Sequence, residues 1–260
     1  MKKNEKNNSS SNGRNFGRKG RNQLNDVLKI YKMKIAIIPA RSGSKRIKNK
    51  NIIKFRGKPL ISYTIKNLIK ANLFDLIIVS TDSKKIQNIS IKSGAKILFT
   101  SPKYLSDDFT GTSDVINHSI RFLKDKGFKM KYVCCVYPTS IMLNEKDITQ
   151  SFNKLKLNNL DYVFSVTDYG HPPQRGFYLK KNKIQLIQKK YFKKRTQDLP
   201  KMYHDAGQFY WGRVDSWLKN KSIFTNKSFG YKLSRYVVDL DNKEDLEALK
   251  QIFNFKYQKN

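Results

Sequence analysis

The sequence is poor in cysteine and has no long apolar run. A membrane-spanning helix requires about 18 or more consecutive apolar residues, and no stretch of this chain approaches that length. The two cysteines, Cys134 and Cys135, are neighbours in a short apolar run, so in a strand their side chains point to opposite faces. No further Cys or His stands at zinc-binding spacing, and the N-terminus lacks the apolar core of a signal peptide. We expect two buried thiols, no disulfide, no membrane partner and a cytoplasmic location.

Acidic residues are also scarce. The chain has 20 Asp and Glu against 53 Lys and Arg, which gives a formal charge of +33. Such a charge is typical of nucleic-acid binding. Lysine is spread over the whole chain, however, with abundant Asn and Ile, as an AT-rich coding sequence can produce. No RNP, KH, zinc-finger or helix-turn-helix pattern accompanies the charge. We expect no nucleic-acid partner and keep a basic RNA-binding protein as a remote alternative.

The common phosphate-binding fingerprints are missing. A Walker loop needs Gly, four residues, then Gly-Lys-Ser/Thr. The only Gly-Lys pair is Gly57-Lys58, which is followed by Pro59, and Ile52 stands five residues before Gly57. No GxGxxG fingerprint follows the first strand. The chain is therefore neither a P-loop protein nor a protein with a standard dinucleotide-binding turn.

The first 32 residues consist mainly of Asn, Lys, Ser and Gly. They bury too little apolar surface to offset the entropy cost of ordering. We predict a disordered low-complexity extension at 1–32 and a folded domain at 33–260. Met33 directly precedes the first strand, so we expect the functional protein to begin there. The activity of a chain that starts at Met33 tests this hypothesis.

From residue 33 onward, strands and helices alternate with short links. This alternation predicts an α/β fold, with a mostly parallel sheet covered by helices on both faces. The unalternating apolar run 132–137 indicates a parallel strand that is buried on both faces. The expected strands are 35–38, 76–80, 96–99, 132–137 and 162–166, and the expected helices start near 60, 84, 112 and 145.

The alternation breaks between residues 168 and 231. We predict that this range is an insertion, with extended pieces at 177–179 and 184–187, that forms a substrate lid and part of a dimer contact. The chain is then expected to return to the sheet at 235–240 and to end in a helix at about 243–253.

Two strand ends carry chemistry. The strand Ile35–Ile38 ends at Pro39 and leads into a small, cationic loop up to Asn51. Such a loop suits a polyanion cradle, although a solvated turn remains the alternative. At 237–241, alternation places Asp239 and Asp241 on one side of a strand, about 7 Å apart, which suits a hard divalent cation. The alternative for Asp241 is that it caps the last helix.

The string IIPARSGSKRIKNKN resembles the N-terminal signature of the sugar-acid cytidylyltransferases, which make CMP-activated nonulosonic acids. The resemblance implies a Rossmann-like nucleotidyltransferase that binds CTP, with Mg²⁺ (or Mn²⁺) on Asp239 and Asp241. It implies that Arg41, Lys45 and Asp241 act in catalysis, the two cations on the triphosphate. We assign Arg46 to packing or solvent. The implied nucleotide-binding residues are Ala40, Arg41, Gly43, Ser44, Lys45, Lys50, Asn51, Ser80 and Asp82.

Three further strings, at 107–112, 173–175 and 203–212, resemble the pseudaminic acid subgroup of this family. Tyr137 stands where the sialic-acid enzymes carry Gln. The resemblance implies that CTP and a nine-carbon sugar acid are the substrates, pseudaminic acid above all, and we expect a homodimer. N-acetylneuraminic acid, legionaminic acid and KDO remain the alternatives. The implied sugar-binding residues are Tyr137, Gln174, Arg175, Arg195, His204, Asp205 and Gln208.

Two questions about these sugar residues stay open at this point. Arg195 corresponds to the family arginine that pairs with the sugar carboxylate, a task suited to bidentate guanidinium geometry, whereas Arg175 could equally be structural. His204 is a sugar ligand or a loop histidine. The alternating aromatic run 209–211 could wall the sugar with one face and pack into the core with the other.

Overall fold

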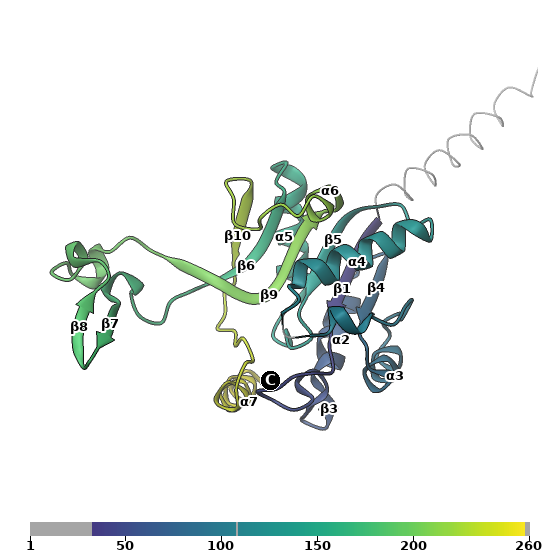
Figure 1. Cartoon of the computed structure of the whole chain (residues 1–260), viewed down its shortest axis with the longest axis horizontal. Helices are drawn as coiled ribbons and strands as arrows, with labels where there is room; N and C mark the ends of the chain where they lie inside the picture. The colour runs from purple at the N-terminus through teal and green to yellow at the C-terminus, as the bar shows by residue number, and fades with distance from the viewer. Residues whose placement is uncertain (1–32, 108, 258–260) are drawn as a thin grey trace, which may run out of the picture.

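The computed structural model describes residues 33–107 and 109–257. The extension predicted to be disordered, 1–32, lies outside the described residues, as does Asp108. The core is a six-stranded sheet with the order β10-β6-β9-β5-β1-β4 (Figure 1). Its strands are β1 (Met33–Pro39), β4 (Leu76–Ser80), β5 (Met130–Val136), β6 (Tyr162–Asp168), β9 (Tyr203–Arg213) and β10 (Ser228–Lys232).

The sheet is mostly parallel, as the sequence predicts. β1 runs parallel to β4 and β5, and β10 runs parallel to β6. β9 is the exception, because it is inserted antiparallel between β5 and β6. β5 is buried on both faces, as predicted. Of its two neighbours, however, only β1 runs parallel to it.

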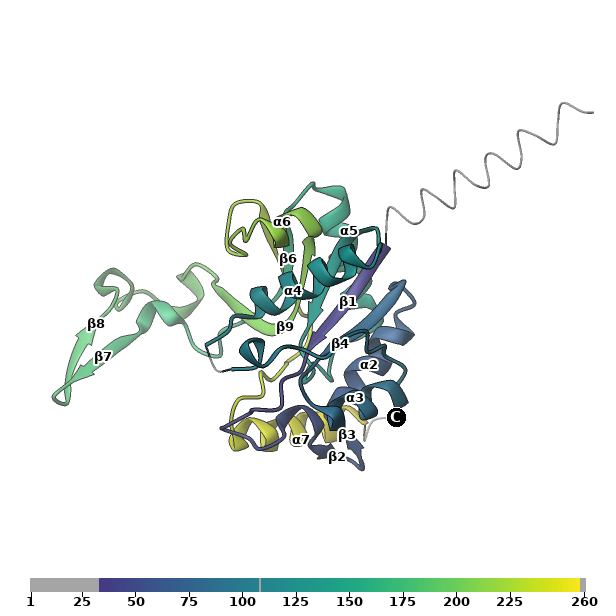
Figure 2. The same cartoon turned by 45° about the vertical axis from the view of Figure 1, so that its right-hand side comes forward.

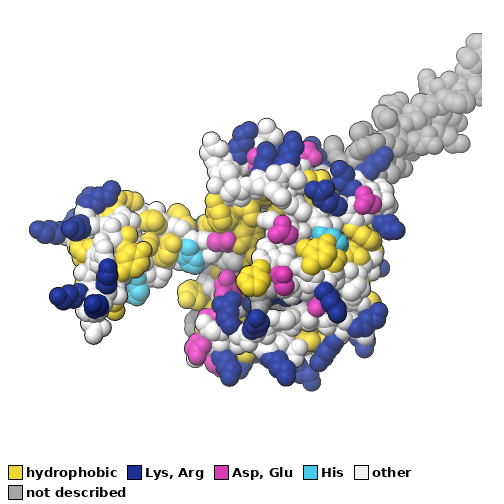
Figure 3. All heavy atoms as spheres, viewed as in Figure 1, with side chains coloured by type: hydrophobic (Ala, Val, Ile, Leu, Met, Phe, Trp, Pro, Cys, Tyr) yellow, Lys and Arg dark blue, Asp and Glu magenta, His cyan; other side chains and the backbone are white. Residues whose placement is uncertain are grey.

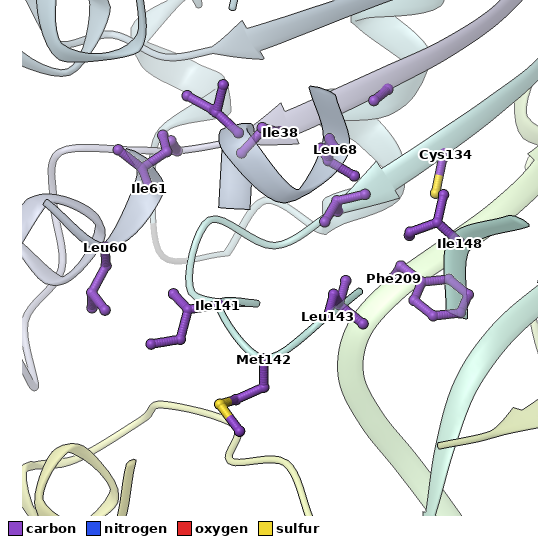
Figure 4. Packing of buried hydrophobic residues seen from close by; sticks show 14 of the residues in the cluster. Ile38, Leu60, Ile61, Leu68, Cys134, Ile141, Met142, Leu143, Ile148 and Phe209 are labelled. Atoms are coloured by element: carbon purple, nitrogen blue, oxygen red, sulfur yellow. The ribbon is translucent and has the colours of Figure 1, made fainter. Parts of the chain in front are cut away.

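Helices cover both faces of the sheet, so the fold class is confirmed. One layer contains α2 (Leu60–Lys70), α3 (Lys84–Lys92), α5 (Glu145–Leu157) and α7 (Lys243–Tyr257). The other layer contains α4 (Thr112–Asp125) and α6 (Val214–Leu218). Figure 4 shows part of the first layer, in which side chains of α2, α5 and the strands meet; its labelled residues include Ile38, Leu60, Ile61, Leu68, Cys134, Ile148 and Phe209.

The two cysteines divide between these layers. Cys134 packs in the layer of α2 and α5, and Cys135 packs in the layer of α4 and α6. Both are fully buried free thiols, and burial raises the pKa of each above its usual value. The prediction of two buried thiols is confirmed.

Helix starts follow local capping chemistry. The Ser83 hydroxyl accepts the amide of Ile86 at the start of α3. Asn144 and Asp147 exchange side-chain and backbone hydrogen bonds in a capping box at α5. Asn242 and Asp245 make the same exchange at α7, with distances of 2.9 and 2.8 Å. Asn242, not Asp241, thus caps the last helix.

The predicted strand 96–99 is wrong. Lys96 makes one isolated bridge to Ile78, with its amide donating to Ile77 O (2.8 Å) and its carbonyl accepting from Val79 N (3.1 Å). The chain then leaves the edge of β4, and a short 3₁₀ turn, η2 (Lys103–Leu105), follows. An apolar run alone could not show that only one residue of it finds a strand partner.

The predicted strand 235–240 is also wrong, because the chain rejoins the sheet earlier, through β10. Backbone groups of the later segment are instead satisfied by side chains. Gln208 Nε2 donates to Val238 O (3.3 Å), and Lys50 Nζ donates to Leu240 O (2.7 Å). Asp241 N donates to Asp245 Oδ2 (2.8 Å).

An arm projects from the sheet between β6 and β9 (Figures 1 and 2). The ends of these two strands form its stalk, where Asp168 pairs with Tyr203. The arm carries the expected hairpin, β7 (Phe177–Lys180) and β8 (Lys183–Leu186), turned at two residues with positive φ. It also contains the 3₁₀ turns η3 (Pro173–Arg175), η4 (Lys189–Tyr191) and η5 (Thr196–Asp198).

The arm contains fewer residues than the insertion predicted at 168–231, because β9 and β10, which lie within that range, belong to the central sheet. Apolar side chains gather on the arm, and lysine and arginine side chains stand both at its outer end and over the visible face of the body (Figure 3). The division into domains stays a prediction.

A small hairpin, β2 (Lys54–Phe55) and β3 (Lys58–Pro59), precedes α2, and η1 (Lys50–Ile52) ends the cationic loop. Figure 2 shows this hairpin beside α7. The two are joined by the Phe55 and Phe253 rings, which meet edge to face at 4.9 Å. Among the described residues, no helix combines the length and apolarity of a membrane span.

A substitution at Gly212 tests how closely the Tyr162 and Trp217 rings pack against β9. A Cβ at this position would lie 2.7 Å from Tyr162 Cε1 and 2.8 Å from Trp217 Cε2, and both rings are buried. We expect Gly212→Ala to lower the free energy of unfolding by about 1–3 kcal/mol, as measured by urea denaturation. Gly170→Ala is the matched control, because a Cβ there meets nothing within 4 Å. Equal stability of the two variants would contradict the packing account.

Candidate active site

A cavity of about 640 Å³ opens at the carboxyl ends of β1, β4 and β5. Parallel strands place their carboxyl ends at one edge of the sheet, which is where α/β proteins bind ligands, and the volume suits a small molecule. The first loop, the segment before α4, and the segment before α7 complete its wall. Its polar and charged lining residues include Arg41, Ser44, Lys45, Arg46, Lys50, Asn51, Ser80, Ser101, Asp107, Thr110, Thr112, Tyr137, Thr139, Asp239 and Asp241.

The first loop is fastened by side-chain hydrogen bonds. Asp82 accepts twice from Ser42, from the amide (2.9 Å) and from the hydroxyl (2.6 Å). Asn51 is buried and donates from Nδ2 to Arg41 O (2.9 Å). The Arg41 guanidinium in turn contacts the Asp107 carbonyl across the cavity mouth. These contacts fix the conformation of the first loop at the cavity.

Cations of this loop meet the carboxylate of Asp241. Arg46 Nη2 lies 2.9 Å and Lys50 Nζ 3.3 Å from Asp241 Oδ1. Arg46 is exposed to solvent, as its assignment to packing or solvent allows, but it also lines the cavity and pairs with an acid 195 residues later in the chain. Its sequence position, inside the cationic loop, is the signal that could have found it.

Asp239 and Asp241 border the cavity together, although the strand that was expected to align them does not form. Burial and the neighbouring Asp241 raise the pKa of Asp239, while Lys50 opposes this shift. Gly207 has a φ of 59°, and a Cβ there would lie 2.7 Å from Asp239 Oδ2. The backbone of β9 therefore approaches this carboxylate as only glycine allows.

We tested whether this pair fits a divalent cation. Within 33–107 and 109–257, no group of three or more His, Cys, Asp or Glu side chains is gathered to hold a metal. Mg²⁺ is nevertheless commonly bound by one or two carboxylates, with phosphate oxygens and water completing its shell. Asp239 and Asp241 fit that sharing mode, in a cavity that also presents phosphate-binding cations.

Tyr137 forms the opposite wall. Its hydroxyl lies 3.0 Å from Thr112 Oγ1, and its ring meets that of Tyr210 edge to face at 5.7 Å. Tyr210 donates to Asp205 Oδ2 at 2.5 Å. Burial raises the pKa of Tyr137 to about 12 and that of Tyr210 still further, so both phenols are protonated at neutral pH.

The structure brings most of the predicted nucleotide and metal residues to one cavity. Gly43 and Asp82 are not among the lining residues; Gly43 is exposed, and Asp82 supports the loop through Ser42. Of the predicted sugar residues, Tyr137 lines the cavity. The predicted residues that line it are Ala40, Arg41, Ser44, Lys45, Lys50, Asn51, Ser80, Tyr137, Asp239 and Asp241.

Three predicted sugar residues lie on the arm. Gln174 is buried there, with Nε2 donating to Pro200 O (2.5 Å). Arg175 contacts the Lys194 carbonyl. Arg195 is exposed and paired with Asp198 at 2.8 and 3.2 Å. Within one chain, the arm holds all three outside the cavity lining.

The remaining predicted sugar residues belong to β9. His204 is exposed on the stalk, with its ring 4.8 Å from that of Tyr169. Gln208 is buried, and its amide donates to Ala206 O (2.9 Å), so the structure uses it to fasten backbone. Asp205 lies outside the cavity lining and accepts a hydrogen bond from the Tyr210 hydroxyl. The aromatic run is buried as well: Phe209 and Trp211 pack in one layer and Tyr210 in the other, so neither face of it is an open wall.

Several lining residues were not assigned as site residues from the sequence: Ser101, Thr110, Thr112 and Thr139. Ser101 pairs with Ser80, hydroxyl to hydroxyl, at 2.6 Å. Thr112 opens α4 and reaches Tyr137. The polar run 106–111 before this helix was the available signal. Only the folded chain places it against the first loop.

Comparison with known proteins agrees with a nucleotide-binding site at this cavity. A family model for cytidylyltransferases matches residues 35–260. The chain is 40% identical over 226 residues to a pseudaminic acid cytidylyltransferase of Campylobacter jejuni subsp. jejuni serotype O:2, which covers 86% of this chain and 97% of that protein. It is 29% identical over 219 residues to an N-acylneuraminate cytidylyltransferase of Escherichia coli O18:K1:H7, which covers 82% of this chain and 50% of that protein.

A solved structure of CMP:2-keto-3-deoxy-manno-octonic acid synthetase complexed with CTP has a TM-score of 0.65 to this chain at 12% identity, covering 86% of this chain and 99% of that one. This likeness shows the fold, a Rossmann-like nucleotidyltransferase sheet. The family match and the 40% identical relative show more: the chain belongs to the cytidylyltransferase family and is a nucleotidyltransferase.

The anchor of the first loop can be tested. Asp82→Ala removes both hydrogen bonds to Ser42, and we expect the KM for the nucleotide to rise by about one order of magnitude, the effect of roughly 1.5 kcal/mol. Ser42→Ala is the matched control, because its amide still donates to Asp82 and its KM should rise less. Steady-state kinetics measures both, and an unchanged KM in Asp82→Ala would contradict the anchoring role.

Proposed function

We propose that this enzyme transfers CMP from CTP to pseudaminic acid and releases pyrophosphate. The observation that carries the proposal is the 40% identity to a pseudaminic acid cytidylyltransferase over nearly the whole length of that relative. The cavity supports it, because cations of the first loop and two carboxylates surround a space of suitable volume.

The nucleotide half of the site is proposed to lie along the first loop. Arg41 and Lys45 would neutralise the triphosphate and the departing pyrophosphate, since phosphoryl transfer is catalysed mainly by positioning and charge stabilisation. Lys50 and Asn51 would hold the nucleotide against the loop. Ser80 would contribute a hydroxyl from the end of β4. The anomeric hydroxyl of the sugar then attacks the α-phosphate in line with the leaving group.

A divalent cation, Mg²⁺ or Mn²⁺, is proposed to be held by Asp239 and Asp241. When bound, such an ion neutralises phosphate charge and polarises the oxygens it contacts. The protein's own contribution is to keep the two carboxylates at the cavity wall. Lys50 holds Leu240 between them, and the Gly207 backbone leaves room for Asp239.

The sugar half is proposed to be completed by a second copy of the chain. Tyr137 lies in the cavity, but Gln174, Arg175 and Arg195 lie on the arm. The arm also exposes large apolar side chains, which is typical of an interaction surface: Phe177, Tyr178, Leu179, Ile184 and Ile187. We therefore propose a homodimer in which the arm of one copy reaches the cavity of the other. A cytoplasmic location agrees with the use of CTP.

Pyrophosphate release tests the function directly. The enzyme is offered each nucleoside triphosphate with pseudaminic, legionaminic and N-acetylneuraminic acids and with KDO. We expect release with CTP and pseudaminic acid at a kcat/KM well above that of every other pair. A higher kcat/KM with another sugar acid would overturn the substrate assignment.

Asp241→Asn tests the metal pair. The substitution removes a charged ligand without changing the volume, so we expect kcat to fall by about two orders of magnitude or more with an unchanged unfolding midpoint. Asp168→Asn is the matched control, because Asp168 is also paired with a lysine, Lys232 at 2.7 Å, but outside the cavity. Near-normal turnover of Asp241→Asn would remove it from the metal site.

Arg195→Ala tests the arm. We expect the KM for the sugar acid to rise far more than the KM for CTP, because the guanidinium is proposed to bind the sugar carboxylate. Equal rises would remove Arg195 from that role. Mixing Arg195→Ala with Asp241→Asn distinguishes the two copies: an arm that acts on its partner restores about a quarter of wild-type activity at equal mixing. An arm that acts on its own cavity restores none.

A further inference from the structure

We infer that Arg46 is a removable counter-ion of Asp241, which makes the binding of CTP and the binding of the divalent cation depend on each other. Phosphate oxygens of the nucleotide draw the guanidinium away from the carboxylate, and only then is the carboxylate open to the cation. The inference rests on the proposed function and deepens it. Arg46 is a positioning residue, because it acts on the cation through Asp241.

Two cations share one oxygen of Asp241. Arg46 Nη2 lies 2.9 Å and Lys50 Nζ 3.3 Å from Oδ1. A carboxylate oxygen that binds Mg²⁺ must approach the ion to about 2.1 Å, so this oxygen cannot serve both side chains and the ion. Each of the two side chains also repels a nearby divalent cation. Together they cancel the formal charge of the Asp239–Asp241 pair, which leaves little attraction for a free divalent ion.

The two cations differ in how firmly they are held. The Lys50 side chain is only 23% exposed, and its Nζ also donates to Leu240 O at 2.7 Å. The Arg46 side chain is 68% exposed, and within the described residues Asp241 is the one hydrogen-bonding or ionic partner of its guanidinium. Exposed ion pairs contribute little to stability. Arg46 is therefore the cation that can leave.

A nucleotide supplies the groups that Arg46 binds after it leaves. Arg46 lines the same cavity as Arg41, Ser44 and Lys45 of the first loop, where the triphosphate is proposed to lie. A guanidinium binds phosphate oxygens in a bidentate, charge-assisted manner, and a triphosphate carries more negative charge than one carboxylate. We expect the exchange to move this exposed side chain and not the anchored backbone of the loop.

The consequence is a coupling between two ligands. Whatever CTP adds to the affinity for the cation, the cation adds to the affinity for CTP. A cation that bridges phosphates and Asp241 would give such a coupling without Arg46, so coupling alone does not test the inference. The mark of a counter-ion is that its removal has opposite effects: the cation by itself binds more tightly, and CTP by itself binds more weakly.

The test measures the binding of Mn²⁺ alone and of CTP alone to full-length Arg46→Ala. Electron paramagnetic resonance follows free Mn²⁺, and calorimetry with a chelator present follows CTP. We expect the Kd of Mn²⁺ to fall by about tenfold, because a unit charge beside a divalent ion has been removed. We expect the Kd of CTP to rise by about tenfold, because a charge-assisted contact is lost.

Lys48→Ala is the matched control. Lys48 is an exposed cation of the same loop, but it is not among the cavity-lining residues, so both constants should stay within about twofold of wild type. Arg46→Lys keeps the positive charge and should return the Kd of Mn²⁺ to within about threefold of wild type. The double variant Arg46→Ala/Asp241→Asn should lose the gain in Mn²⁺ affinity, because the uncovered carboxylate is gone.

The opposite signs also separate a counter-ion from a structural residue. A loss of folded protein weakens the binding of both ligands and cannot mimic a gain for one of them. Unchanged or weaker Mn²⁺ binding by Arg46→Ala, unchanged CTP binding, or a gain that persists in the double variant overturns the inference, while pyrophosphate release by the wild type leaves the proposed function standing. A wild type that releases no pyrophosphate from CTP with any sugar acid overturns the proposed function and the inference with it.

Discussion

The cavity depends on the contact between the first loop and the segment before the last helix. The Lys50 ammonium joins them, with the Leu240 carbonyl at 2.7 Å and the Asp241 carboxylate at 3.3 Å. This segment has no strand partner, so side chains must satisfy its backbone groups. Lys50 meets that need and also keeps cations and carboxylates on one wall. Loss of this contact would separate the two halves of the charge pattern on which catalysis is proposed to depend.

The antiparallel strand β9 is the second constraint. It fills the sheet between β5 and β6 and supplies buried aromatic side chains to both layers. The same strand carries Gly207, whose backbone approaches Asp239, and Tyr210, whose ring meets that of Tyr137 edge to face. One strand therefore positions both the proposed metal wall and the proposed sugar wall. Its continuation into the stalk links these walls to the arm.

The charged side chains of the cavity differ from those of the remaining surface in how they are paired. The chain has a net charge of +33, and on the visible face of the body the lysines and arginines are scattered (Figure 3), where single charges are screened and contribute little. At the cavity, by contrast, cations and acids are matched: Arg46 and Lys50 share Asp241. Ligand phosphates can compete for these cations, so the same groups that hold the wall in place are available to a nucleotide. The arm differs from the cavity wall because it exposes large apolar side chains. Binding of a partner surface would bury them, whereas the charges of the arm can stay in water.

Local pattern in the sequence determined the α/β class, the buried cysteines, the helices α2 and α5, and the cationic loop after β1, because each depends on neighbouring residues alone. Tertiary structure decided the rest. It turned 235–240 from an expected strand into a side-chain-bonded segment, brought Arg46 to Asp241, and buried Gln208 in the core. It also joined the Tyr210 hydroxyl to Asp205. These outcomes depend on which backbone groups find partners across the fold, and periodicity along the chain carries no information about such distant contacts.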